Sequence, residues 1–132
     1  MRPVHAGDLR IEAWAATREE CVAEAVEALV GSFTRRSLPA IAWTSYFDVT
    51  GAGDTELLRG ALLRVISGLR KDHVIPVSVQ VSANQAGLRL RCAMVDAGAI
   101  LPGGALPMGV TPGSVHCVHR MDLWWCVARI DV

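Results

Sequence analysis

Two amphipathic helical segments, each preceded by a strand-like stretch, constrain the fold of this chain most strongly. The first follows a capping box, Thr-Arg-Glu-Glu at residues 17–20, and is predicted to end near Val30, with Gly31 as its stop. The second is predicted to begin with Asp54 as its N-cap and to end near Arg70. Both segments carry apolar residues at helical spacing, which predicts that both helices pack against a sheet.

Alternating apolar and polar residues predict six strands around these helices. The predicted ranges are 4–14, 41–49, 77–82, 88–94, 115–121 and 124–132. Residues 84–87 are predicted to form a hairpin turn, whereas residues 97–114 are uncharged, rich in glycine and proline, and expected to form a long connector. The order strand–helix–strand–helix followed by four strands predicts one α+β domain over residues 1–132, with two helices packed on an antiparallel or mixed sheet.

Composition limits the classes of function. The 13 basic and 13 acidic residues balance, so we expect no tight nonspecific nucleic-acid binding. No stretch is long and apolar enough for a membrane span and no secretion signal is evident, which favours a cytoplasmic protein. Four cysteines lack CxxC spacing, which disfavours zinc. Cys117 and Cys126 could face each other across a hairpin, but reduced, packed thiols are expected.

The candidate metal ligands lie near the two ends of the chain. Asp8 and Asp131 are predicted on strand faces opposite the apolar sets, and Val132 adds a terminal carboxylate. Such hard oxygen donors suit Ca²⁺ or Mg²⁺. If the first and last strands are neighbours, the three groups can share a cation. The other interpretation, which spacing alone favours, pairs Asp8 with Arg10 or Arg129 and leaves Asp131 solvated.

Enzymatic chemistry has little support in the sequence, because no nucleophile or metalloprotease motif is present. His116 and His119 are three residues apart and fall on opposite faces of a strand, so they make a poor pair of ligands. A small hydrolase using Asp8 with His116 or His5 is the weakest alternative. Trp125 is predicted to point outward beside the carboxylates, as a partner contact or as cover for an edge strand.

Several motifs in order resemble the archease family, small proteins that assist the GTP-dependent RtcB-type RNA ligase. Residues 5–9, His-Ala-Gly-Asp-Leu, resemble the His-Thr-Ala-Asp motif of the first strand, and residues 17–21 resemble the Thr-x-Glu-Glu helix that follows. The second helix, from Asp54, and the final Asp131-Val132 are also similar to the family.

The resemblance implies a metal site formed by Asp8, Asp131 and the carboxylate of Val132, and it reverses the preference drawn from spacing. Calcium is the expected cation, with magnesium or manganese as alternatives. The implied function is that of an accessory protein, not an enzyme, which promotes guanylylation and multiple turnover of the ligase in tRNA splicing or RNA repair. The residues that could face this partner are His5, His116, Arg129 and Trp125.

Several features depart from the family pattern, among them a shortened hairpin before the last strand. His116 stands where the family has a lysine, Met121 stands where it has a histidine, and the connector 97–114 lacks the family's charged signature. These departures keep one alternative open, a stand-alone chaperone-like or protein-binding module that has the archease fold without ligase coupling.

Overall fold

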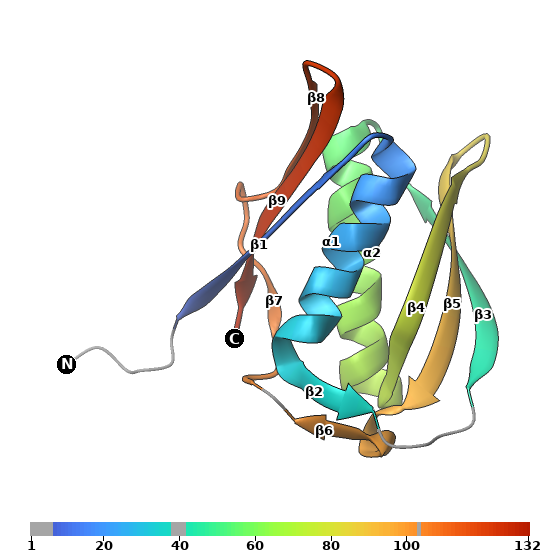
Figure 1. Ribbon diagram of the computed structural model, residues 1–132, viewed down its shortest axis with the longest axis vertical. Helices are drawn as coiled ribbons and strands as arrows, with labels where there is room; N and C mark the ends of the chain where they lie inside the picture. The colour runs from blue at the N-terminus through green and yellow to red at the C-terminus, as the bar shows by residue number, and fades with distance from the viewer. Residues whose placement is uncertain (1–6, 38–41, 103) are drawn as a thin grey trace.

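A computed structural model describes residues 7–37, 42–102 and 104–132 of the chain (Figure 1). The elements in chain order are β1 (Asp8–Ala15), α1 (Arg18–Phe33), β2 (Thr34–Ser37), β3 (Trp43–Thr50), α2 (Asp54–Ser67), the π-helical turn η1 (Gly68–Asp72), β4 (Val74–Ala83), β5 (Gly87–Asp96), the short 3₁₀ turn η2 (Ala97–Ala99), β6 (Ile100–Pro102), β7 (Gly109–Val110), β8 (His116–Arg120) and β9 (Leu123–Asp131).

The two long helices lie between two antiparallel sheets, as Figure 1 shows. One sheet has β1 on one side of β9 and both β7 and β8 on the other, and the second has the order β3–β5–β4. Helix α1 packs on β1, β9 and β4, while α2 packs on β8 and β3. The α+β fold with two helices covering sheet is confirmed. The expected single sheet is divided, and every strand pairing among the described residues is antiparallel.

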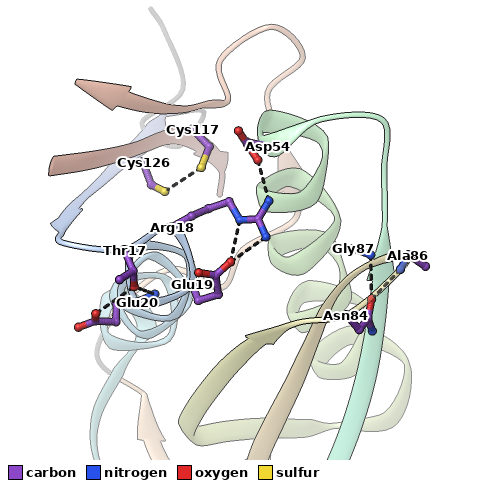
Figure 2. Close-up of polar contacts among 10 residues, drawn as sticks. All are labelled: Thr17, Arg18, Glu19, Glu20, Asp54, Asn84, Ala86, Gly87, Cys117 and Cys126. Atoms are coloured by element: carbon purple, nitrogen blue, oxygen red, sulfur yellow. Dashed lines mark hydrogen bonds and ion pairs between the residues drawn. The ribbon is translucent and has the colours of Figure 1, made fainter. Parts of the chain in front are cut away.

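The start of α1 forms the Thr17 half of the predicted capping box, whereas the Glu20 carboxylate binds the Thr17 hydroxyl in place of a backbone N–H. The Thr17 hydroxyl oxygen accepts from the Glu20 backbone N–H at 3.1 Å, and its O–H donates to the Glu20 carboxylate at 2.9 Å (Figure 2). The helix continues past Gly31 to Phe33, so the predicted stop was wrong. Phe33 is buried in the core, and this burial favours the extra turn over the stop that glycine permits.

The start of α2 differs from the prediction. Gly53 occupies the N-cap without a side-chain hydrogen bond, and Asp54 is the first helical residue. The Asp54 carboxylate instead accepts from the Arg18 guanidinium at 2.8 Å, an ion pair that joins the beginnings of the two helices (Figure 2). A distant partner therefore replaced the local capping bond that Asp54 was expected to make.

The β4–β5 hairpin forms where it was predicted. The Asn84 side-chain oxygen accepts from the backbone N–H groups of Ala86 and Gly87 (Figure 2). Gly87 has a φ of +156°, a region that favours glycine. The predicted alternation along β4 fails at Val77, because a bulge between Pro76 and Ser78 turns the valine toward solvent.

The connector 97–114 was expected to lack regular structure, and this expectation was wrong. It contains β6, which pairs with β2, and β7, which pairs with β9. These two short pairings attach the connector to β2 and to β9.

One hydrophobic core joins the apolar faces of the helices to both sheets. Within the described ranges, no polar or charged side chain is fully buried. All four cysteines are buried and reduced, and Cys117 lies opposite Cys126 with 3.5 Å between the sulfur atoms (Figure 2). In the part of the chain that the structure describes, no helix is both long and apolar enough to cross a membrane.

Candidate cation site on the outer face of β1 and β9

The pairing of β1 with β9 places Asp8 directly opposite Asp131. The neighbouring residues along the two strands, Leu9 and Ile130, also pair, and their side chains lie on the core-facing side of the sheet. Ile130 is completely buried. Because side chains alternate along a strand, both aspartates lie on the outer face of the sheet. Val132 follows directly, and its side chain packs against the core. The expected meeting of the first and last strands is therefore present.

The Asp131 carboxylate is held by the segment that precedes β8. The Thr111 hydroxyl donates to one carboxylate oxygen of Asp131 at 2.6 Å, and the Met108 N–H donates to its backbone carbonyl at 2.6 Å. A Cβ added to Gly109 would lie 3.4 Å from the other carboxylate oxygen, so the backbone of Gly109 lies close to the Asp131 side chain. The orientation of Asp131 is thus set by contacts outside its own strand.

A tight turn positions Thr111 for this contact. The Ser114 N–H donates to the Thr111 carbonyl at 3.2 Å, and Gly113 has a φ of +77°. Pro112 followed by Gly113 is the sequence signature of a type II turn. Sequence reasoning missed Thr111 as a site residue, although the Thr-Pro-Gly-Ser signature at residues 111–114 could have identified the turn.

Asp8 has a different neighbour. Its carboxylate lies 3.6 Å from the Arg129 guanidinium, and both side chains are largely exposed. This ion pair agrees with the alternative interpretation of the sequence, in which Asp8 pairs with Arg129 at the surface. Asp8 nevertheless lies on the same face as Asp131. The ion pair with Arg129 and a shared cation site are therefore both compatible with this strand pairing.

The donor set fits a hard cation in its chemistry. Asp8, Asp131 and Thr111 offer only oxygen atoms, the ligands that Ca²⁺ and Mg²⁺ prefer. Within the described ranges, no three His, Cys, Asp or Glu side chains gather closely enough to hold a metal ion by themselves. A cation here therefore needs further oxygen ligands, and it would share the Asp8 carboxylate with the positive charge of Arg129.

The residues suggested as a partner surface mostly share this outer face. Arg129 lies between the aspartates and Trp125 along β9, and His116 of β8 pairs with Val127. The His116 and Trp125 rings are parallel, with centroids 6.4 Å apart. His5 lies outside the described residues. His119 stacks on Trp124 with centroids 4.9 Å apart, which confirms that the two histidines of β8 occupy opposite faces.

Trp125 is fixed by its neighbours on this face. Its indole N–H donates to the Glu12 carboxylate, and together with Arg10 this bond lowers the pKa of Glu12 below its ordinary value. The Trp14 ring lies 5.8 Å from that of Trp125, and the Arg120 guanidinium lies 5.6 Å from the Trp125 ring. A half-exposed, positioned aromatic cluster of this kind is typical of protein interfaces.

The hydrolase alternative loses support from this geometry. Asp8 pairs with Asp131, whereas His116 pairs with Val127, four residues away along β9. Four residues of strand span about 13 Å, which exceeds hydrogen-bond reach. Asp8 and His116 therefore do not form a catalytic pair, and His5 lies outside the described residues.

The fold and this face define a class of small α+β protein in which two helices lie between antiparallel sheets and the strand ends carry acidic residues. Residues 3–98 match the model of the archease protein family (MTH1598/TM1083). The chain is 31% identical over 128 residues to a probable protein archease of Mycobacterium tuberculosis (strain CDC 1551 / Oshkosh), covering 97% of this chain and 72% of that protein. The protein of the strain ATCC 25618 / H37Rv matches to the same extent. The chain belongs to the archease family.

A solved structure supports the fold independently. The crystal structure of an archease from Thermotoga maritima, described as a possible chaperone, superposes with a TM-score of 0.71. The match covers 100% of this chain and 97% of that one, at 13% sequence identity. At this identity the likeness shows the shared fold alone.

Proposed function

We propose that this protein is a metal-binding protein cofactor of a GTP-dependent RtcB-type RNA ligase. It would promote ligase guanylylation and multiple turnover in tRNA splicing or RNA repair, without being an enzyme itself. The observation that carries the proposal is the pairing of Asp8 with Asp131 on one exposed face, in a chain of the archease family. The proposal includes a cytoplasmic location, where the ligase would meet its RNA.

The proposed ligands are Asp8, Asp131 and the terminal carboxylate of Val132. Calcium is the expected cation because it accepts six to eight oxygen ligands in flexible geometry, and water can complete such a shell. Magnesium or manganese are alternatives with stricter geometry. A bound cation supplies positive charge beside an acidic strand end, and Asp131, oriented by Thr111, keeps its second oxygen free of that hydrogen bond.

The proposed ligase contact is the outer face next to these ligands. Arg129, His116 and Trp125 follow one another from the carboxylates toward the β8–β9 turn, because His116 pairs with Val127, and His5 is a further candidate outside the described residues. Tryptophan and arginine are the residue types that most often dominate binding energy at interfaces. A partner that covers this face would therefore contact the cation ligands and the aromatic cluster together.

A multiple-turnover ligation assay tests the proposal directly. We would combine limiting RtcB-type ligase, excess broken RNA and GTP with the wild type, with Asp8→Asn or Asp131→Asn, and with the matched control Asp48→Asn on the opposite sheet. The wild type and the control are expected to raise product well above one equivalent of ligase. The two site variants are expected to leave the reaction near a single turnover, and calcium calorimetry should show weakened binding for both.

Two results would contradict the proposal. If the wild type leaves ligation unchanged, the protein is not a cofactor of this ligase, and a stand-alone protein-binding module becomes the better account. If all variants stimulate equally, the Asp8–Asp131 pair is not the activating site. A C-terminal extension by one glycine tests the Val132 carboxylate separately, because it moves that group away while keeping both aspartates.

A further inference from the structure

A second candidate site lies on the far side of the helices from β1 and β9. It is a cavity of about 450 Å³ between the helix-facing side of β3 and the end of α2, where the helix passes into η1. The cavity is partly open to solvent at its edge, so a ligand can enter it. Its volume falls within the range of small-molecule pockets.

Small residues and a widened helical turn create the hollow. Ser45 lies on the helix-facing side of β3 between Trp43 and Phe47, where a larger apolar residue would fill the space. Gly68 begins the π-helical turn on the opposite wall. Such turns are rare and frequently occur at functional sites. The small side chain of Ser45 on one wall and the π-helical turn on the other therefore leave this space open.

The interior of the cavity is apolar and aromatic. Val65, Leu90 and Met94 form buried walls, and burial raises the pKa of the Cys92 thiol to about 11, so that this group also stays neutral. Trp43 faces the same space but remains 45% exposed, which is unusual for a tryptophan on the core-facing side of a strand. Its ring offers a flat surface to a planar ligand.

The rim of the cavity carries a net positive charge. Arg64 and Lys71 line it together with a single carboxylate, Asp72. The Arg64 guanidinium lies 4.5 Å from the centroid of the Phe47 ring, which holds it at the cavity. The ion pairs found among the described residues involve other side chains. An excess of one positive charge suits a singly charged anion.

We propose that this cavity binds a small aromatic carboxylic acid, with its ring against Trp43 and its carboxylate at Arg64 and Lys71. A guanidinium binds a carboxylate through two parallel hydrogen bonds, which gives orientation as well as affinity. The Ser45 and Ser67 hydroxyls line the same space and can donate to the ligand. A phosphate dianion fits less well, because its second charge would face Asp72 without a matching cation.

Calorimetric titration with 2-naphthoate tests the assignment. Three matched probes separate its parts: 2-naphthamide lacks the charge, decanoate lacks the ring, and 2-naphthyl phosphate carries the extra charge. We expect 2-naphthoate to bind at least tenfold more tightly than each of them. Quenching of tryptophan fluorescence by 2-naphthoate should be smaller in Trp43→Phe. No binding of 2-naphthoate at millimolar concentration, or equal or tighter binding of any matched probe, overturns the proposal.

Variants give an independent test. Arg64→Gln is expected to weaken 2-naphthoate at least tenfold while leaving 2-naphthamide unchanged. Arg59→Gln is the matched control, because Arg59 lies on the same helix and pairs with Glu56 outside the cavity. If Arg64→Gln does not fold, the exposed Lys71→Gln takes its place. Ser45→Leu should fill the cavity and abolish binding of 2-naphthoate. Equal affinity in the cavity variants and the control would contradict the site.

Discussion

At the scale of single residues, Arg129 would compete for Asp8 with a cation at the proposed site. Their ion pair is long, at 3.6 Å, and both side chains are exposed, so it contributes at most about 1 kcal/mol. Removing the guanidinium frees the Asp8 carboxylate and removes a repelling charge from the proposed site.

Arg129→Gln is therefore expected to raise calcium affinity by about two- to fivefold, measured by calorimetry. Arg89→Gln is the control, because Arg89 pairs with Asp48 on the opposite sheet. Unchanged or weaker calcium binding in Arg129→Gln would mean that Asp8 is not a ligand.

The buried thiol of Cys92 makes stability depend on alkaline pH. Burial raises its pKa from 9.0 to about 11. Below pH 9 the thiol is protonated in both states, whereas between pH 9 and 11 it ionises only in the unfolded chain. The free energy of unfolding therefore falls as pH rises through this window, by about 2 kcal/mol at pH 10.5 from this group.

Urea unfolding of the wild type and of Cys92→Val at pH 8 and pH 10.5 measures this contribution. The other thiols titrate in both proteins, so the difference between the two free energies should change by about 2 kcal/mol. A difference that stays constant with pH would show that Cys92 does not titrate abnormally.

At the scale of elements, the cap of α1 is the clearest local contribution to stability. Thr17→Ala removes the oxygen that accepts from the Glu20 backbone N–H and is expected to cost about 1 kcal/mol in urea unfolding. Thr17→Ser retains the hydroxyl and should recover most of this loss. A loss of the same size in both variants would assign the effect to packing of the threonine methyl group.

Two glycines should respond oppositely to alanine. At Gly87 a Cβ would lie 2.2 Å from the Val49 carbonyl oxygen, so Gly87→Ala is expected to destabilise by about 2 kcal/mol or more. Gly31 lies within α1 with no atom near the added Cβ, so Gly31→Ala should stabilise by about 0.5–1 kcal/mol. Thermal unfolding of both variants checks the pair, and two shifts of the same sign would contradict it.

The elements that sequence predicted best are those whose signals are local. The α1 cap, the Asn84 turn and the alternation of β1 and β9 depend only on residues close in sequence. Their patterns can therefore be recognised without knowledge of the fold. The β2–β6 pair was missed because β2 reads Thr-Arg-Arg-Ser without alternation and β6 includes a proline. Those strands form because the fold brings them together.

In the candidate site, too, the residues with a local sequence signal were predicted and those that depend on tertiary contacts were missed. Asp8 and Asp131 could be predicted because each follows a strand pattern that fixes its face. Arg129 was foreseen as a neighbour of Asp8. Thr111 was missed because its contact with Asp131 depends on how the connector returns to β9. The Arg18–Asp54 pair was missed for the same reason, since it joins residues of two different helices.

At the scale of the whole molecule, one core between two sheets carries most of the stability. Leu62 is fully buried, whereas its neighbour Leu63 is 42% exposed. Leu62→Ala is expected to lower the free energy of unfolding by about 3 kcal/mol, and Leu63→Ala by less than about 0.5 kcal/mol. Chemical denaturation measures both, and similar losses would mean that the layer arrangement around α2 is wrong.

The position of β9 at the centre of its sheet has a consequence for biosynthesis. Among the described elements, β1 leaves the ribosome first and β9 leaves it last, yet β9 is the strand with which β1 pairs (Figure 1). The β3–β5–β4 sheet has all its strands much earlier and can assemble during translation. The layer that bears Asp8 and Asp131 must therefore close after most of the chain has been made, and a nascent chain stalled before residue 123 would lack it altogether.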